Sequence, residues 1–202
     1  MFINCSEAST RELYRLMTGS IVPRPIAWVS SISSDGICNL APFSFFNAFS
    51  AAPPVVGFSP GFKRDDSGEK VEKDTLKNVR EVGEFVVNLV SRPLAEKMNL
   101  TSADFPPEVD EFQEVGLLQA ESTIVKPPRL KEAMVSMECS VIQIVPLGGG
   151  NLVLGEIACM HFADGVIKDG IVDLDVLQPV GRLGGEYYCS VGERFSLPRP
   201  SV

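Results

Sequence analysis

Histidine is almost absent from this chain of 202 residues, and the two common glycine-rich phosphate loops are missing. His161 is the only histidine, so one subunit cannot form a catalytic or metal site that needs two. The sequence has no G-x-G-x-x-G between a strand and a helix and no G-x-x-x-x-G-K-[ST]. Any phosphate bound here must therefore be held by side chains and by the start of a helix.

Basic charge is also scarce, with 18 basic residues against 26 acidic ones and a formal net charge of -8. The basic residues are dispersed, and such a surface repels both phosphodiester backbones and anionic lipid. We therefore expect no nucleic-acid and no membrane partner. No run of about 18 apolar residues occurs, and residues 1–7 lack the charged start and apolar centre of a secretion signal. These absences predict a cytoplasmic protein.

The cysteines are too few and too widely spaced for a disulfide or zinc framework. Their number is odd and no C-x-x-C occurs, so we expect free thiols, mostly buried among apolar residues, and no metal site. The five positions are Cys5, Cys38, Cys139, Cys159 and Cys189.

The apolar and charged fractions, 45% and 22%, are those of an ordinary globular protein, and the length suits one domain over residues 1–202. Helices are predicted at 10–19, 74–82 and 94–100, whereas 62–72 reads as an exposed charged loop and the region from about 105 shows no clear periodicity. Strands are predicted at 25–32, 37–41, 54–59, 84–90, 134–145 and 151–162. Six or more strands with short turns predict a mainly β protein, a closed or partly closed antiparallel barrel with helices over its ends.

The helix that starts near Asp74 is the first candidate site. Asp74 is the expected N-cap, and Gly83 follows the last apolar position of the helix. Lys73 adds a positive charge and Thr75 a hydroxyl to the free amides of the helix start, which together favour an anion such as phosphate. The alternative is an ordinary capped helix without a ligand.

The second candidate is the segment from Asn39 to Asn47, which combines polar donors with aromatic rings. Asn39, Ser44 and Asn47 can donate to the carbonyl groups of a heterocycle or to a phosphate, with Ser44 and Asn47 expected in a loop. Phe43, Phe45 and Phe46 can wall an aromatic ligand or belong to the core or an interface. Together with the Asp74 helix, this inventory suits an aromatic ring that carries a phosphate.

Four further positions have two readings each. Trp28 can line a ligand or fill the core. Arg24 lies between two prolines, a rigid setting that directs its guanidinium towards an anion or leaves it as a surface charge. His161 can face a ligand as a titratable group or be a satisfied structural histidine. Residues 182–188, with an arginine, two glycines and two tyrosines, form either a closing element over a site or a simple turn.

These segments resemble the flavin reductase-like proteins of the FMN-binding split-barrel fold. The resemblance is carried by Arg24-Pro-Ile-Ala-Trp-Val-Ser-Ser with Asn39-Leu-Ala-Pro-Phe-Ser-Phe-Phe-Asn, by Lys73-Asp-Thr with Gly83-Glu-Phe-Val-Val-Asn, and by Pro179-Val-Gly-Arg-Leu-Gly-Gly-Glu-Tyr. Three motifs in the same order and at similar spacing make the match specific over about residues 10–200.

The resemblance implies a homodimer of six-stranded Greek-key barrels, each binding one FMN near the subunit interface. By position, Ser30, Ser44, Lys73 and Thr75 would hold the phosphate and ribityl chain, and Asn39, Ala41, Phe45 and Asn47 would line the flavin. The implied activity is reduction of flavin by NADH or NADPH, with electrons passed to a partner oxygenase or another acceptor. Two alternatives stay open: an FMN-binding electron carrier without its own reductase activity, and a barrel that binds no flavin.

Overall fold

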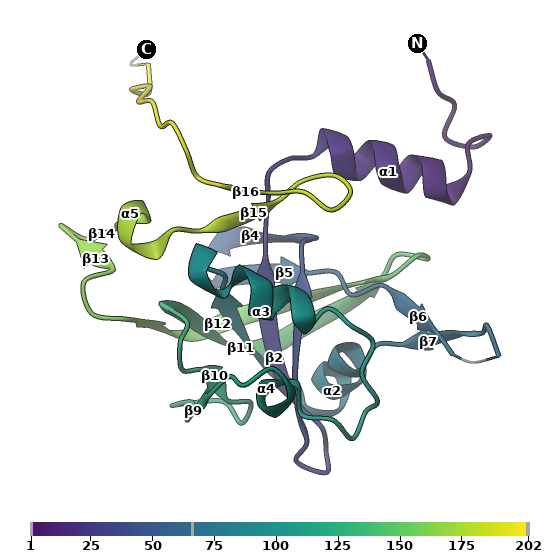
Figure 1. The fold of residues 1–202 in the computed structure, drawn as a ribbon, viewed down its shortest axis with the longest axis horizontal. Helices are drawn as coiled ribbons and strands as arrows, with labels where there is room; N and C mark the ends of the chain where they lie inside the picture. The colour runs from purple at the N-terminus through teal and green to yellow at the C-terminus, as the bar shows by residue number, and fades with distance from the viewer. Residues whose placement is uncertain (1, 66, 201–202) are drawn as a thin grey trace.

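The computed structural model describes residues 2–65 and 67–200, and its centre is one seven-stranded sheet (Figure 1). Every neighbouring pair of strands in this sheet is antiparallel. In spatial order the strands are Cys38–Phe43 (β3), Ala27–Ile32 (β2), Glu84–Leu89 (β8), Val135–Pro146 (β11), Asn151–Phe162 (β12), Pro54–Phe58 (β5) and Phe46–Ala51 (β4).

Both faces of this sheet are covered, and β2 shows how. Side chains alternate along a strand, so Ala27 and Val29 point to one face and Trp28 to the other. The first face packs on the helix Asp74–Val82 (α2), and the second packs on Ala95–Leu100 (α3) and Glu111–Glu114 (α4). Because both faces are buried, β2 does not alternate apolar and polar residues, and its two serines, Ser30 and Ser31, are buried as well.

The remaining elements lie around the sheet, and all of them except the first helix are short. They are the helices Thr10–Ser20 (α1), Arg92–Leu94 (η1) and Leu174–Leu177 (α5); the hairpins Phe62–Arg64 with Lys70–Glu72 (β6, β7), Gln119–Ala120 with Arg129–Leu130 (β9, β10) and Ile167–Lys168 with Ile171–Val172 (β13, β14); and a small sheet of Arg24–Pro25 (β1), Val180–Arg182 (β15) and Tyr188–Ser190 (β16). In Figure 1, α1 and the β15–β16 hairpin lie together at the top, and α2 and α4 lie in the lower part of the view.

The mainly β fold is confirmed, but a closed barrel and a count of six strands are not. Among the described residues, β3 and β4 each pair on one side only, so hydrogen bonds do not close the sheet into a ring, and its strands number seven, not six. The unexpected strand is β4, which follows β3 after a connection of two residues. That connection, Ser44-Phe45, has none of the glycine, proline or asparagine signals by which a turn is recognised from sequence. Asn47 consequently lies on a strand, not in a loop.

The charged segment 62–72 is a hairpin, β6–β7, and the prediction of an unstructured loop was wrong. It lacks an apolar run because it extends from the sheet and its strands contain little buried surface. The thiols are all free, as expected, although only Cys38 and Cys139 are buried and Cys5 is exposed. No helix in the described part of the chain has the length and apolarity to cross a membrane.

Candidate functional site

The start of α2 differs from its expected form, because Lys73 and not Asp74 occupies the N-cap position. The Lys73 side chain makes no capping hydrogen bond, and Asp74 is the first helical residue. Two ion pairs flank this start: Lys63 Nζ lies 2.8 Å from Asp74 Oδ2, and Lys73 Nζ lies 3.4 Å from Asp104 Oδ1. The helix start therefore carries two cations and leaves its first amides without a side-chain acceptor.

Buried hydrogen bonds fix this helix start against β3. Thr75 Oγ1 donates to Asn39 Oδ1 at 2.6 Å, and Asn39 Nδ2 donates to Glu111 Oε1 at 2.6 Å. The Glu111 carboxylate also accepts from the amide of Leu40 at 3.0 Å. Burial raises the pKa of Glu111, and these hydrogen bonds oppose that shift. Asn39 and Thr75 thus act as anchors that join α2, β3 and α4.

A small cleft opens at this point, which we call the α2 cleft. Its volume is about 170 Å³, a size suited to one phosphate group but not to an aromatic ring system. Ala41, Lys73, Asp74 and Thr75 line it together with Lys63. Five of the residues expected to bind FMN therefore line this cleft: Asn39, Ala41, Lys73, Asp74 and Thr75.

A second cavity, the apolar groove, lies between α1 and the end of β3. Its volume is about 600 Å³, and its lining includes Tyr14, Met17, Ser44, Phe45 and Leu147. Tyr14 and Phe45 are neighbours, with ring centroids 6.4 Å apart. The predicted positions Ser44 and Phe45 thus belong to a surface suited to a flat apolar ligand.

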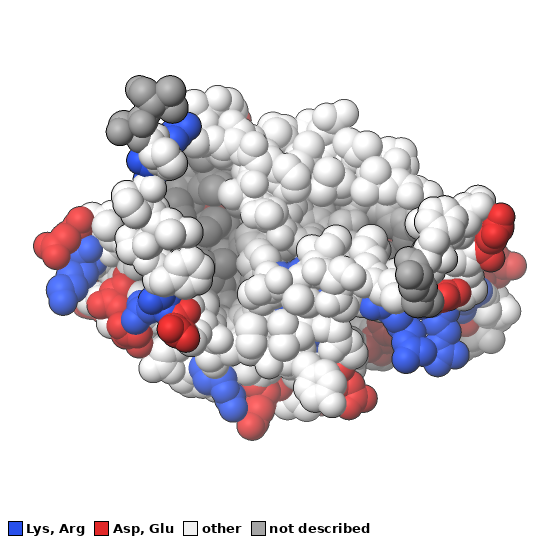
Figure 2. All heavy atoms as spheres, turned by 90° about the horizontal axis from the view of Figure 1, so that it is seen from above, with Lys and Arg blue, Asp and Glu red and all other residues white. Residues whose placement is uncertain are grey.

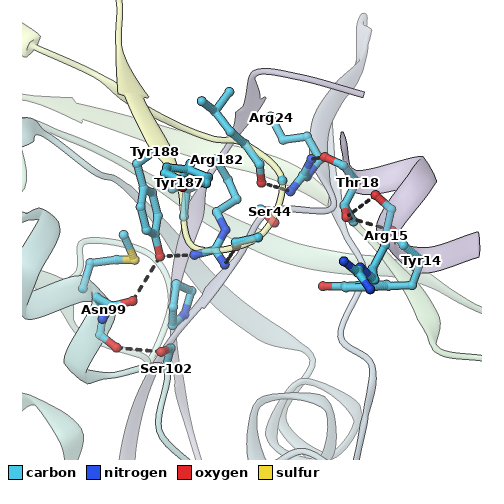
Figure 3. Close-up of a pocket in the computed structure, with 16 residues that line it drawn as sticks. Tyr14, Arg15, Thr18, Arg24, Ser44, Asn99, Ser102, Arg182, Tyr187 and Tyr188 are labelled. Atoms are coloured by element: carbon cyan, nitrogen blue, oxygen red, sulfur yellow. Dashed lines mark hydrogen bonds between the residues drawn. The ribbon is translucent and has the colours of Figure 1, made fainter. Parts of the chain in front are cut away.

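The third cavity, the arginine pocket, lies between α1, α3 and the β15–β16 hairpin and has a volume of about 570 Å³ (Figure 3). Arg24 and Arg182 face each other across it, and Asn99 and Ser102 come from α3 and the residues that follow it. Arg24 Nη1 donates to the carbonyl oxygens of Thr18 and Ile21, so the guanidinium also ties α1 to β1. Its Nε is buried and has no hydrogen-bond partner.

Pro42, near the end of β3, lines all three cavities. Because the α2 cleft, the apolar groove and the arginine pocket share Pro42, they adjoin one another near the end of β3, which is an edge strand of the main sheet. The two sequence segments singled out above thus meet in a single region.

Three of the residues expected to bind FMN lie outside this region. Trp28 and Ser30 are fully buried, and each donates a hydrogen bond within the protein: Trp28 Nε1 to Thr101 Oγ1 at 2.9 Å and Ser30 Oγ to the Pro128 carbonyl at 2.5 Å. They present no surface to a ligand in this structure. Asn47 lies on β4, and its Oδ1 accepts from the Ala48 amide at 2.8 Å.

His161 also lies elsewhere, on β12, where its Nε2 is 2.6 Å from Glu138 Oε1 and 3.5 Å from Cys159 Sγ. These three groups are close enough to share a metal ion. However, Glu138 already accepts from the amides of residues 123–125, and Arg129 Nε lies 3.9 Å from its carboxylate. The nearby positive charge disfavours a cation, so the geometry describes a histidine oriented by a carboxylate.

Sequence reasoning missed several residues of the three cavities. No sequence pattern marked Lys63 as a site residue, because it lies in the segment that was expected to be a loop. No pattern marked Asn99 either, because α3 is short. Tyr14 looked like an ordinary helix residue. Arg182 and Tyr188 belong to the segment that suggested either a closing element or a turn, and they form one wall of the arginine pocket.

Comparison with known proteins gives the family. The model of the family described as "Flavin reductase like domain" matches residues 18–174. This range includes β3, α2 and every strand except β15 and β16. The chain belongs to the flavin reductase-like family.

Several solved structures are similar to this protein over nearly the whole chain. Nitrilotriacetate monooxygenase component B from Bacillus cereus is 35% identical with a TM-score of 0.90, and the match covers 98% of both chains. The 2-nitrobenzoate 2-nitroreductase NbaA of Pseudomonas fluorescens is 37% identical with a TM-score of 0.86, covering 99% of this chain and 96% of that one. A Shewanella frigidimarina protein described as a flavin reductase with a split barrel domain has a TM-score of 0.82 at 22% identity, covering 99% and 100%, which shows the shared split-barrel fold.

Proposed function

We propose that this protein is an FMN-dependent oxidoreductase that takes electrons from NADH or NADPH and passes them to an acceptor. The observation that carries the proposal is the continuous series of cavities along the free edge of β3, in a chain of the flavin reductase-like family. The likeness to a monooxygenase component and to a nitroreductase, both above 30% identity, supports redox chemistry and a partner oxygenase or a small organic acceptor.

The α2 cleft fits the phosphate of FMN. Lys73 and Lys63 supply charge, and the first amides of α2 supply donors and the positive end of the helix dipole. The Lys73–Asp104 pair must open, but Asp104 is 66% exposed, and such a pair contributes only about 0–1 kcal/mol. A hydrogen bond to an ionic group contributes about 1.5–3 kcal/mol, so a phosphate competes well for Lys73.

The apolar groove fits the flavin ring, with Phe45 and Met17 against its faces and Ser44 beside its polar edge. FMN bound there would supply reversible electron and hydride transfer. Asn39 and Thr75 hold the helix start in register with β3, and the polar tip of Arg24 keeps α1 in position. The catalytic role of His161 stays a prediction, because Glu138 orients its ring through Nε2 but His161 lines none of the three cavities.

We further propose a homodimer with the interface on the face that carries α1. Only Thr18 of α1 is buried, while Tyr14, Leu16 and Met17 are 57%, 43% and 44% exposed. Figure 2, viewed from above Figure 1, shows a broad uncharged surface on this face with charged residues mainly towards its margins. A second subunit would cover these apolar residues and close the groove over the flavin. The molar mass in solution tests this proposal: a homodimer should have twice the 21.9 kDa of one chain.

Titration with FMN tests the cofactor proposal. Lys73→Ala should weaken FMN binding by about 1–3 kcal/mol, because the phosphate loses a charged hydrogen bond. Lys77→Ala is the matched control, since Lys77 is exposed on the same helix and lines none of the three cavities. Equal FMN affinities of the two variants would remove Lys73 from the site.

Absorbance spectra of the FMN-loaded protein identify the electron donor. They are recorded in the absence of oxygen, after NADH and NADPH are added separately. Loss of the oxidised flavin band with either nucleotide is the expected result. A flavin that stays oxidised with both would instead favour an electron carrier that is reduced by another protein. Absence of any FMN uptake would leave a barrel without flavin and would refute the proposal.

A further inference from the structure

The arginine pocket is positively charged although the protein as a whole is acidic. Three arginines, Arg15, Arg24 and Arg182, line it, and no aspartate or glutamate does. The α2 cleft, by contrast, contains both lysines and carboxylates, which pair with one another. An unpaired group of cations in a chain of net charge -8 concentrates anions at that place.

Neutral groups hold the two inner arginines in place. Arg24 donates to backbone carbonyls of α1, of the segment after it and, at 3.0 Å, of Leu183. Arg182 donates to the Tyr188 hydroxyl and, at 2.6 Å, to the carbonyl of Gly185. Neither forms an ion pair with a carboxylate of the described residues. Their positions are therefore fixed while their charges remain uncompensated.

The proximity of these cations has a cost that an anion would offset. Burial lowers the pKa of Arg24, Tyr14 opposes this shift, and the positive charge of Arg182 adds to it. Both guanidinium groups stay charged, since arginine remains protonated in proteins. A carboxylate or phosphate between them would replace mutual repulsion by charge-assisted hydrogen bonds.

Aromatic side chains surround the charged centre. The Arg182 guanidinium lies over the Tyr188 ring, 4.4 Å from its centroid, and the Tyr188 hydroxyl donates to Asn99 Oδ1 at 3.1 Å. Tyr187 stands beside this pair and is 75% exposed (Figure 3). Exposed rings beside a fixed guanidinium favour a flat unsaturated ligand over a small inorganic anion.

We propose that the arginine pocket binds the second substrate of the flavin through an anionic group, a carboxylate or phosphate, attached to a planar ring. This inference rests on the proposed function, which places the flavin ring in the adjacent apolar groove, and Pro42, Ser44 and Tyr14 line both cavities. A nicotinamide nucleotide and an aromatic carboxylic acid share the required chemistry.

Calorimetric titration of the FMN-loaded protein with two matched pairs of ligands tests the inference. It also distinguishes an aromatic acid from a nicotinamide nucleotide as the second substrate. One pair is benzoate and benzamide; the other is nicotinamide mononucleotide and nicotinamide riboside, in oxidised forms that cannot reduce the flavin. In at least one pair the member with the carboxylate or phosphate should bind about tenfold more tightly. A preference for benzoate identifies an aromatic acid, and a preference for the mononucleotide identifies a nicotinamide donor.

Two variants tie the preference to the pocket. Arg182→Gln removes the stacked cation, and Arg15→Gln removes an exposed one whose side chain makes no hydrogen bond in the described structure. Arg15→Gln thus keeps the test valid if Arg182→Gln disturbs the hairpin. Each should reduce the preference several-fold and leave FMN occupancy unchanged. Arg80→Gln, on the outer side of α2 and paired with Glu72, is the control and should behave like the wild type.

The proposal is overturned if neither pair shows a preference, or if the preference survives in both variants. It is also overturned if Arg182→Gln releases FMN, because the pocket would then hold the flavin phosphate. FMN uptake is read by absorbance before each titration. A wild-type protein that takes up no FMN would refute the proposed function, and the same titrations on the flavin-free protein would then decide whether the pocket selects anions.

Discussion

At the scale of single residues, Glu138 shows how a buried charge is kept in this fold. Its side chain is fully buried in the middle of the sheet, on β11. Burial raises the pKa of this carboxyl, but the amides of residues 123–125, together with His161, outweigh that effect and lower it to about 2. Glu138 thereby fixes the long irregular segment before β10 onto the sheet.

This pKa predicts how stability depends on pH. The folded-state value lies below the ordinary 4.5, so the stabilisation by the ionised carboxylate is complete above about pH 4.5 and is lost as the pH falls towards 2. Glu138→Gln should lower the free energy of unfolding at neutral pH by about 1–3 kcal/mol and flatten its decline in acid. Urea unfolding between pH 7 and 2.5 measures both effects.

The control is Glu156→Gln, which changes an exposed residue on β12. It should leave the pH profile of the wild type unaltered. If Glu138→Gln kept the full acid dependence, another carboxylate would have to be responsible for it.

The sequence predicted which residues would come together better than it predicted what each of them would contact. Asn39, Lys73 and Thr75 do meet, as their polar and charged nature suggested, but Asn39 and Thr75 bond to each other across 36 positions of the chain. Trp28 and Ser30 were expected to face a ligand and instead lie in the interior. Tertiary packing decides which face of a strand a polar residue lies on and which group it hydrogen-bonds to. A local sequence pattern carries no information about these long-range contacts.

At the scale of elements, α1 is the helix least explained by a single subunit. The sequence predicted it nearly to its ends, from its apolar spacing and its terminal glycine. Its apolar side chains, however, find little to pack against within the chain, which is why we assign α1 to a subunit interface.

Met17→Glu tests this assignment, because a charge at a buried apolar contact must lose its hydration. Light scattering should give twice 21.9 kDa for the wild type and the mass of a single chain for the variant. Arg11→Gln, an exposed polar change on the same helix, should leave the dimer intact. A monomeric wild type, or a dimer that tolerates Met17→Glu, would contradict an interface at α1.

The other elements show where local patterns suffice. α2 and the long hairpin β11–β12 were predicted because apolar spacing and glycine-rich turns are local features. The β6–β7 hairpin and β4 escaped prediction because one is too polar and the other has no turn signal before it. The two-residue strands β9 and β10 pair with each other, and β10 packs against β8 and β11 of the main sheet, so no local pattern predicts them.

At the scale of the whole molecule, the order of strands creates the site. β3 is at an edge, so its free side can receive a ligand, and α2, α1 and the β15–β16 hairpin reach that edge from three distant parts of the sequence. The general architecture was predictable from strand spacing and motif resemblance. The division of the edge into the α2 cleft, the apolar groove and the arginine pocket was not, because it depends on how these three elements pack together.

A crystal structure of the protein grown with FMN tests the central claim most directly. Our account predicts the phosphate within hydrogen-bonding distance of Lys73 and of the first amides of α2, and the ring in the apolar groove against Pro42 and Phe45. A phosphate lodged between Arg24 and Arg182, or a sheet edge filled by the protein's own side chains with no flavin bound, would contradict it.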